Sequence, residues 1–298
     1  MSLLVVGTVA FDAIETPFGK TDKIIGGAAT YIGLSASKLF DKISLISVVG
    51  GDFPKETIEM FKKHNISVDG LQVKEKEKTF FWSGKYHENM NIRDTIDTQL
   101  NVLKHFDPII PEEINNPDFL MLGNVVPSVQ LNVFNQINKK PKLVAMDTMN
   151  LWIDNCHEDL INVIKKVDIL MINDQEILEL HQENDINLAI SKSFELGLEY
   201  IIVKMGSEGA LLISKMGQKF KCPAVEIENV IDPTGAGDSF AGGFMGYIAS
   251  KNSHTFDDLK NAVRWGTVMA SFCVENFGTK NIIGIDDSSK KNRFNSLV

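Results

Sequence analysis

The sequence has few of the residues that stabilise small secreted domains or cross membranes. Its three cysteines, Cys156, Cys222 and Cys273, are far apart in the 298 residues and form no C-x-x-C pair. We recognise no secretory signal, and no apolar run approaches the roughly 18 residues of a membrane span. We therefore expect three reduced thiols in a cytoplasmic protein that has no membrane partner.

Positive charge is also scarce. The chain has 30 Lys and Arg against 39 Asp and Glu, which gives a net charge of −9 and a pI near 5.2. Binding of nucleic acid depends on clustered cations at the phosphates, so we do not expect a nucleic-acid partner. Small anionic ligands remain compatible with this charge, because glycine-rich loops bind them locally.

Short apolar runs alternate with helical stretches along most of the chain. The expected buried strands are Leu3–Gly7, Ile43–Val49, Phe119–Leu122, Leu143–Met146, Ile169–Ile172 and Ile201–Val203. Helices are expected between them, and we expect Asp52 to cap the one that has Pro54 in its first turn. Strands that alternate with helices indicate βαβ units and a mostly parallel sheet.

Residues 71–98 interrupt this alternation. A charged run at 74–78 is followed by the aromatic segment 79–86, and residues 92–98 alternate like a strand. We expect hairpin strands outside the main sheet, joined by strands from residues 10–25. Such a small sheet has too little core to fold alone, so we expect it to cover a cleft of a single domain that spans 1–298.

The glycine-rich segment 232–243, DPTGAGDSFAGG, is the most informative part of the chain. The apolar run Val225–Ile231, which we expect to be a strand, precedes it, and a helix follows. A glycine loop between a strand and a helix points backbone N–H groups at an anion. Gly235, Ala236 and Gly237 would form a narrow cradle that stabilises the charge of a transferred phosphoryl group.

Asp238 follows this cradle at the start of the expected helix. The helix dipole favours an ionised carboxylate there, which could accept the proton of an attacking hydroxyl group. A G-x-G-D segment taken alone is better explained as a tight turn with a helix cap. A P-loop is excluded, because Ile14 stands where the motif around Gly19-Lys20-Thr21 requires glycine.

The whole segment 232–243 closely resembles the C-terminal signature of the ribokinase-like (PfkB) family of carbohydrate and nucleoside kinases. The resemblance covers nearly the whole chain, including its length, the order of its elements and the interrupting small sheet. It implies a three-layer α/β sandwich with a mostly parallel central sheet and a small β-sheet lid. It also implies that Asp238 is the catalytic base and that Gly235, Ala236 and Gly237 form the anion hole.

Other segments resemble the substrate motifs of this family. Gly26 and Gly27 match its N-terminal di-glycine motif, which contacts the phosphate-accepting substrate. Asp12 matches an early acidic residue that hydrogen-bonds substrate hydroxyl groups. Tyr31 stands where sugar-specific members often place Asn, so the expected substrate is one that differs from ribose and fructose. The alternative for Tyr31 is simple packing on its own helix.

Further substrate contacts are expected from the aromatic lid segment and from the ends of strands. Trp82 and Tyr86 could stack on a base or on a sugar face, although aromatic side chains on a strand also serve ordinary packing. Asn124 and Asp147 each follow a buried strand and are candidates to line the same cleft. Asp147 aligns roughly with an acidic position of sugar kinases.

The resemblance also implies a nucleotide site that holds ATP and Mg²⁺. Asn173 and Glu176 match the N-x-x-E motif and would bind Mg²⁺ through water, whereas helix capping is the alternative. Asp232 matches a residue that lies beside a bound monovalent cation, such as K⁺, in many members. The candidate nucleotide contacts are Asn173, Lys204, Gly206, Gly209, Thr234, Asn276 and Gly278.

The expected function is ATP-dependent transfer of the γ-phosphoryl group to a hydroxyl group of a sugar. A nucleoside (adenosine-like) kinase is the alternative of the same class, favoured by the aromatic residues, whereas the short lid favours a sugar. A non-catalytic sugar-binding sensor on the same fold is the alternative of another class, and the intact glycine loop argues against it. A homodimer through the lid is expected from the resemblance alone.

Overall fold

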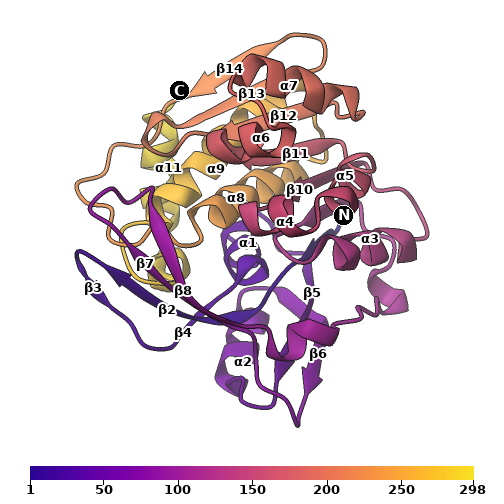
Figure 1. The fold of residues 1–298 in the computed structure, drawn as a ribbon, viewed down its shortest axis with the longest axis vertical. Coiled ribbons are helices and arrows are strands. Elements are labelled where there is room, and N and C mark those ends of the chain that lie inside the picture. Colours follow the sequence, from indigo (N-terminus) through magenta and orange to yellow (C-terminus); the bar gives the residue numbers. More distant parts are fainter.

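Two β-sheets of different size organise the chain, and the computed structural model describes all of residues 1–298 (Figure 1). The strands of the larger sheet are β1 (Leu3–Val6), β5 (Ile43–Gly50), β6 (Ile66–Lys74), β9 (Phe119–Leu122), β10 (Leu143–Asp147), β11 (Ile169–Asn173), β12 (Tyr200–Lys204), β13 (Ala210–Ser214) and β14 (Lys219–Cys222). They run in the order β14-β13-β12-β11-β10-β9-β1-β5-β6. The strands from β12 to β6 are parallel, and β13 and β14 add an antiparallel hairpin at one edge.

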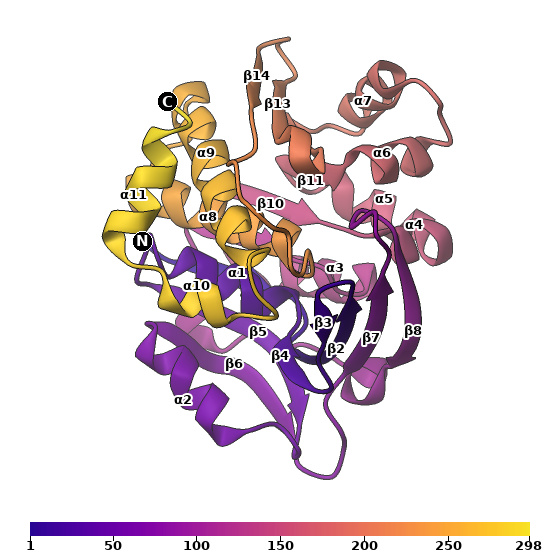
Figure 2. The same ribbon diagram turned by 90° about the vertical axis from the view of Figure 1, so that its left-hand side faces the viewer.

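Helices cover both faces of the larger sheet, as Figure 2 shows. One face carries α1 (Ala28–Ala36), α2 (Lys55–Lys63), α8 (Ala236–Lys251), α9 (Phe256–Cys273), α10 (Lys280–Gly284) and α11 (Asp287–Asn295). The other face carries α3 (Pro127–Gln136), α4 (Asn150–Asn155), α5 (His157–Ile164), α6 (Asp174–His181) and α7 (Ile186–Glu195). None of these helices has the length and apolar composition that crossing a membrane requires.

Strand β1 shows how the sequence is divided between the two faces. Leu3 and Val5 belong to the hydrophobic core beneath α1, α8 and α9, whereas Leu4 and Val6 belong to the core on the opposite face. Successive side chains of a strand point to opposite faces, so an unbroken apolar run is buried on both sides of the sheet. The expected three-layer α/β sandwich with a mostly parallel central sheet is therefore confirmed.

The second sheet consists of β2 (Ala10–Thr16), β3 (Gly19–Lys20), β4 (Ile24–Gly26), β7 (Phe81–Tyr86) and β8 (Arg93–Gln99), and we call it the lid. Strands β2 and β7 pair in parallel at its centre. Strand β8 forms one edge and is exposed along its whole length. Figure 2 shows the lid beside the larger sheet, with β7 and β8 on its outer side.

Two expectations about strands are wrong. Residues 71–74 belong to the larger sheet instead of the lid, because β6 continues along the edge of β5 until Lys74 lies opposite Gly50. The apolar run Val225–Ile231 forms no strand. The chain leaves the sheet after β14, and the N–H group of Ile231 donates to the carbonyl oxygen of Val274 instead.

The expected capping by Asp52 is also wrong, because Pro54 occupies the N-cap position of α2. The carboxylate of Asp52 instead accepts hydrogen bonds from the backbone N–H (2.8 Å) and the hydroxyl (2.7 Å) of Thr79. These bonds stabilise the carboxylate and, although burial opposes them, hold the pKa of Asp52 below its usual value. Asp52 therefore fixes the segment that leads from the larger sheet into strand β7 of the lid.

Helices α1 and α8 pack with their backbones in direct contact. A Cβ atom on Gly242 would overlap with the carbonyl oxygen of Ile32, and one on Gly246 would lie 2.8 Å from the Cα of Ala36. Any side chain at these two positions would push the helices apart. Helix α1 begins after Gly27 and helix α8 after Gly235, so this contact fixes the two glycine turns relative to each other.

Replacing Gly246 with alanine is expected to destabilise the protein by about 1–3 kcal/mol, because overpacking exceeds the gain in helix propensity of about 1 kcal/mol. Gly284 offers a matched control, since it also lies in a helix but has nothing within 4 Å of an added Cβ atom. Gly284→Ala should leave stability unchanged or raised. Urea unfolding of both variants checks this, and equal stabilities would contradict the close packing.

Candidate active site

Polar side chains gather where the parallel strands of the larger sheet end. Asp147, Asn173 and Lys204 are the last residues of β10, β11 and β12. The carboxyl ends of parallel strands meet at one edge of a sheet, where ligands of α/β proteins bind. The start of α8 and strand β2 of the lid contribute Asp238 and Asp12, and, besides burial, the charge of Asp238 helps to raise the pKa of Asp12.

The glycine loop forms a recess at the start of α8. Gly235 caps the helix with a φ of 78°, which a residue with a side chain rarely adopts. The backbone N–H groups of Gly237 and Asp238 donate to no protein acceptor. A Cβ atom on Gly237 would lie 3.0 Å from Nζ of Lys204. Free N–H groups at a helix start and a nearby ammonium group make this recess suitable for an anion.

Lys204 is held in place by Asp147. Its Nζ lies 2.8 Å from both carboxylate oxygens, and the two side chains are 17% and 5% exposed. Burial disfavours the charge, but the carboxylates of Asp147 and Glu176 still hold the pKa of Lys204 above its usual value. The ammonium group therefore stays charged beside the recess.

Three further carboxyl groups have unusual titration. Burial, reinforced by neighbouring carboxylates, raises the pKa of Asp12, Glu176 and Asp238 to about 7. For Asp238, Asp147 is the strongest of these neighbours, and Lys204 acts in the opposite direction. A carboxyl group whose pKa lies near neutrality can accept and release a proton at physiological pH.

The di-glycine turn closes the opposite side of the site. Gly27 has a φ of 90°, and a Cβ atom on Gly26 would overlap with the carboxylate of Asp12. Strands β2 and β4 pair antiparallel and place Asp12 opposite Ile24, so the carboxylate lies over this turn. Only glycine at position 26 leaves room for it.

The lid reaches across the site at two points. The hydroxyl of Thr234, in the glycine loop, donates to the hydroxyl oxygen of Tyr86 at 3.1 Å. At the tip of the β7–β8 hairpin, Oδ1 of Asn91 lies 3.2 Å from the position of a Cβ atom on Gly206. Gly206 begins the turn η3 (Gly206–Glu208) that follows Lys204. The lid therefore spans the distance from the glycine loop to the end of β12.

The sequence analysis missed Arg93, the first residue of β8. Against the larger effect of burial, its charge lowers the pKa of Asp12, Glu176 and Asp238, so the guanidinium group lies within electrostatic range of all three carboxyl groups. It also lies 5.5 Å from the centre of the Trp82 ring. A signal was present, because the chain has only three arginines and this one lies in the lid.

Some expected substrate contacts are occupied by the protein itself. Tyr31 is 1% exposed and packs beneath Gly235. The Trp82 ring lies against Gly84 of its own strand. Asn124 accepts a hydrogen bond from the indole of Trp152 at 2.7 Å.

Several of the expected nucleotide contacts are likewise engaged by other groups of the protein. Asn173 and Glu176 form a reciprocal capping box at the start of α6, so the capping interpretation holds for both side chains. Gly209 packs against the end of β14, because a Cβ atom on it would overlap with the carbonyl oxygen of Cys222. Asn276 accepts a hydrogen bond from the backbone of its own turn at 2.8 Å.

Asp232 is a fully buried carboxyl group that has no cationic partner. Its oxygens accept hydrogen bonds from the backbone N–H groups of Thr234 (2.9 Å) and Gly278 (3.3 Å), and no Lys or Arg pairs with it. Burial raises the pKa of Asp232 above its usual value. The carboxyl group joins the glycine loop to the C-terminal turn and leaves its charge uncompensated.

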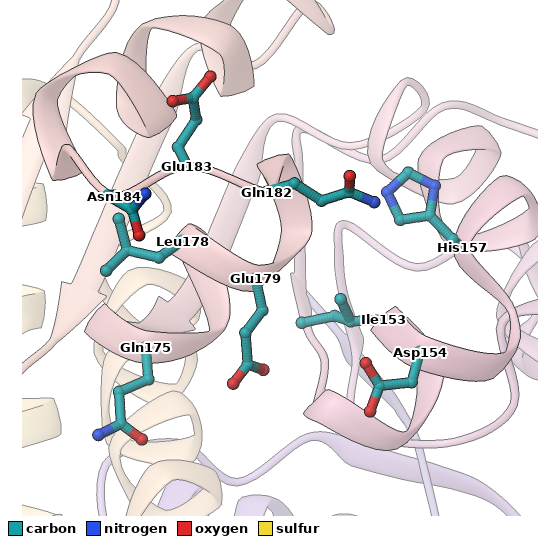
Figure 3. Close-up of a pocket in the computed structure, with 9 residues that line it drawn as sticks. All are labelled: Ile153, Asp154, His157, Gln175, Leu178, Glu179, Gln182, Glu183 and Asn184. Atoms are coloured by element: carbon teal, nitrogen blue, oxygen red, sulfur yellow. The ribbon is translucent and has the colours of Figure 1, made fainter.

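An open cavity of about 650 Å³ lies beside this site, between α4, α5 and α6 (Figure 3). Its lining is mostly polar: Ile153, Asp154, His157, Gln175, Leu178, Glu179, Gln182, Glu183 and Asn184. None of the groups described above lines it. No set of three or more His, Cys, Asp or Glu side chains in the chain is arranged to hold a metal ion by itself.

Known proteins resemble this chain over nearly its whole length. The family model described as "pfkB family carbohydrate kinase" matches residues 2–285. A cytidine kinase of Thermococcus kodakarensis is 27% identical over 287 residues, which cover 95% of this chain and 99% of that protein. A ribokinase of Dictyostelium discoideum is 27% identical over 292 residues, or 86% of this chain and 85% of that protein.

A nucleoside kinase of Methanocaldococcus jannaschii is similar in both sequence and structure. It is 28% identical over 266 residues, which cover 88% of this chain and 82% of that protein. The solved structure of a nucleoside kinase from this organism, an archaeal member of the ribokinase family, has a TM-score of 0.81 at 24% identity and covers 99% of both chains. At that identity the structural likeness shows the fold.

The buried Asp238 predicts how stability depends on pH. Its carboxyl group holds a proton up to about pH 7 in the folded state but only up to about pH 4 when unfolded. Because the folded state binds more protons between these values, the contribution of Asp238 to stability falls as the pH rises through this range. Asp238→Asn removes this loss, so the stability of the variant relative to wild type should increase between pH 5 and pH 8.

Urea unfolding at a series of pH values measures this difference. Asp69→Asn, a change at an exposed position of β6, is the control and should show a difference that does not vary with pH. A constant or falling difference for Asp238→Asn would show that the carboxyl group is not desolvated.

Proposed function

We propose the substrate and the residue roles from one premise: the chain belongs to the pfkB family of carbohydrate kinases, which phosphorylate hydroxyl groups of sugars or nucleosides. The expected family and the expected enzyme class, a phosphotransferase with an alcohol as acceptor, are confirmed. The observation that carries the roles is the position of Asp238. It lies in the first turn of α8, next to the anion recess with Lys204, and, besides burial, its charge helps to raise the pKa of Asp12, whose carboxylate lies over the Gly26–Gly27 turn.

As acceptor we propose a nucleoside, phosphorylated on a hydroxyl group of its ribose. The similarity to a cytidine kinase and to a nucleoside kinase supports this choice. The half-buried Trp82 ring, which packs against Gly84 and lies near Arg93, gives the lid a flat surface on which a base can stack. A free sugar is the second candidate, since a ribokinase is about as similar in sequence. Asp12 would accept hydrogen bonds from ribose hydroxyl groups with either acceptor.

Asp238 is proposed as the general base. Its pKa of about 7 allows it to be ionised at neutral pH and still to accept a proton readily. The carboxylate takes the proton of the acceptor hydroxyl group as the oxygen attacks the γ-phosphorus of ATP, and the bond from that phosphorus to the leaving ADP breaks. Most of the rate enhancement comes from positioning and from stabilisation of charge.

The anion hole is proposed to consist of Gly235, Ala236 and Gly237. The free N–H groups at the start of α8 face the transferred phosphoryl group, and Lys204 lies beside them. Arg93 adds a second cation from the lid. Fixed donors and cations that face a developing charge stabilise the transition state without further reorganisation. Closure of the lid also excludes water, which would compete as a phosphoryl acceptor.

We propose ATP as donor and place it against Lys204, Gly206, Thr234 and the turn that contains Asn276 and Gly278. Mg²⁺, when bound, would neutralise the phosphate charge. Asn173 and Glu176 would hold the ion through water, since no protein cage is present, whereas both carboxylate oxygens of Asp147 are bound by Lys204. The uncompensated carboxylate of Asp232 fits a monovalent cation such as K⁺.

A homodimer through the lid also remains our proposal. Strand β8 is an exposed edge with unpaired backbone groups, and Ile96 on it is 65% exposed. Such edges pair readily with a second chain. The molar mass in solution decides this point. We also propose a cytoplasmic location, because all three cysteines are unpaired thiols.

Asp238→Asn is expected to lower kcat by about 10³-fold, because the amide cannot accept the proton of the acceptor hydroxyl group. ADP release with Mg²⁺-ATP, measured on a panel of nucleosides and free sugars, tests the base and the substrate together. We expect turnover with at least one nucleoside. Turnover on free sugars alone would exclude the nucleoside proposal, and equal rates of variant and wild type would exclude Asp238 as the base.

Arg93→Ala is expected to lower kcat by about 10²-fold with little change in ATP binding, because the removed cation faces charge that develops during transfer. Arg93→Lys should restore part of the loss. Lys85→Ala is the matched control, since Lys85 is a lid cation that pairs with Glu15 away from the site. Steady-state kinetics of the three variants measures the effect. If Arg93→Ala and Lys85→Ala behave alike, Arg93 has no role in transfer.

A further inference from the structure

The ring of Tyr31 supports the anion hole from below. A Cβ atom on Gly235 would lie 2.6 Å from three carbons of this ring, so the face of the ring packs against the glycine backbone. Gly235 is the residue at which the loop turns into α8, with its φ of 78°. The position of the ring therefore determines where the loop backbone lies and where the N–H groups of the recess point.

The backbone of Tyr31 is hydrogen-bonded to the di-glycine turn on the other side of the site. Tyr31 lies in the first turn of α1, and its backbone N–H donates to the carbonyl oxygen of Gly27 at 3.2 Å. The neighbouring Thr30 hydroxyl donates to the carbonyl oxygen of Gly26 at 2.7 Å. A displacement of the di-glycine turn therefore moves the start of α1 and, with it, the ring that carries Gly235.

Tyr31 itself is out of reach of a ligand. Its side chain is 1% exposed, and its hydroxyl oxygen is buried without a hydrogen-bond partner. A buried hydroxyl group without a partner costs about 1–3 kcal/mol, which phenylalanine would avoid in the same space. Contact with the substrate through this hydroxyl group is therefore not what the geometry offers, and the role belongs to the ring.

We propose that Tyr31 is a positioning residue that couples the di-glycine turn, Gly26–Gly27, to the anion hole. An acceptor bound at Gly26 and Gly27 fixes the start of α1, and the Tyr31 ring then fixes Gly235 and the N–H groups that face the transferred phosphoryl group. This proposal rests on the proposed function of the site. Its specific consequence is that removal of the ring impairs transfer but not binding of the acceptor.

The test compares Tyr31→Leu, which removes the ring, with Tyr31→Phe, which removes only the hydroxyl group. Phe244→Leu is the control for core damage, because Phe244 is a fully buried aromatic residue of α8. We measure kcat and the acceptor KM well below the unfolding temperature of each variant. We also measure binding of ADP with aluminium fluoride, a mimic of the phosphoryl group in transfer, which needs no turnover.

Tyr31→Leu is expected to lower kcat by about 10²-fold, with an acceptor KM within about threefold of wild type and weaker binding of the aluminium fluoride complex. Tyr31→Phe should keep all three values and be at least as stable as wild type. Phe244→Leu should lose stability but keep kcat. Tyr31→Met, which fills more of the space, replaces Tyr31→Leu if that variant does not fold.

Three results would overturn the proposal. Equal losses in Tyr31→Phe and Tyr31→Leu would assign the role to the hydroxyl group. A raised acceptor KM with unchanged kcat would indicate direct substrate contact. Unchanged aluminium fluoride binding in Tyr31→Leu would show that the ring does not position the loop. The fluoride measurement stands even if wild type turns over none of the acceptors tested, which would be a failure of the proposed function alone.

Discussion

The backbone contact between α1 and α8 is the constraint on which the geometry of this site depends. Gly242 and Gly246 allow the two helices to approach until main chain meets main chain. The di-glycine turn, where we propose that the acceptor binds, lies at the start of α1, and the anion recess lies at the start of α8. Two loops far apart in sequence are thereby held by a rigid core contact and not by a disulfide, since all three cysteines are free.

The balance of charge at the site explains what the lid contributes to it. Asp12, Asp147, Glu176, Asp232 and Asp238 bring five acidic groups to the site, and the larger sheet supplies one cation, Lys204, against them. Three of these groups have a pKa raised to about 7, because they are buried and because neighbouring carboxylates reinforce the effect. The incoming nucleotide adds more negative charge. Arg93 enters from β8, so the second cation is present only where the lid lies over the site.

The sequence was sufficient where local pattern decides the structure. The runs Leu3–Val6, Phe119–Leu122 and Leu143–Met146, which form β1, β9 and most of β10, are apolar at every position, and burial on both faces of a parallel sheet requires that pattern. The glycine loop and Asp238 were recognisable because the chemistry sits in one contiguous segment. The class of function, a kinase, followed from the same segment.

What the sequence could not show depends on contacts between distant residues. Arg93 lies on a strand exposed along its whole length, which has no periodic burial to indicate that one side chain turns inward. The position of Tyr31 depends on Gly235, about 200 residues away in the chain. The run Val225–Ile231 forms no strand although the outer edge of β14 is open, and the N–H group of Ile231 pairs with Val274 from the distant end of α9 instead. Local composition contains none of this information.

The location of Arg93 bears on whether ATP is hydrolysed when no acceptor is bound. In the proposed mechanism the guanidinium group is carried by the lid instead of the larger sheet, so the complete set of transition-state contacts requires the lid to lie over the site, where Thr234 donates a hydrogen bond to Tyr86. A nucleotide that binds while the lid is open meets water but not the full catalytic set. If Arg93 has the proposed role, placing one cation on the lid separates access from reactivity and would suppress hydrolysis of ATP when no acceptor is bound.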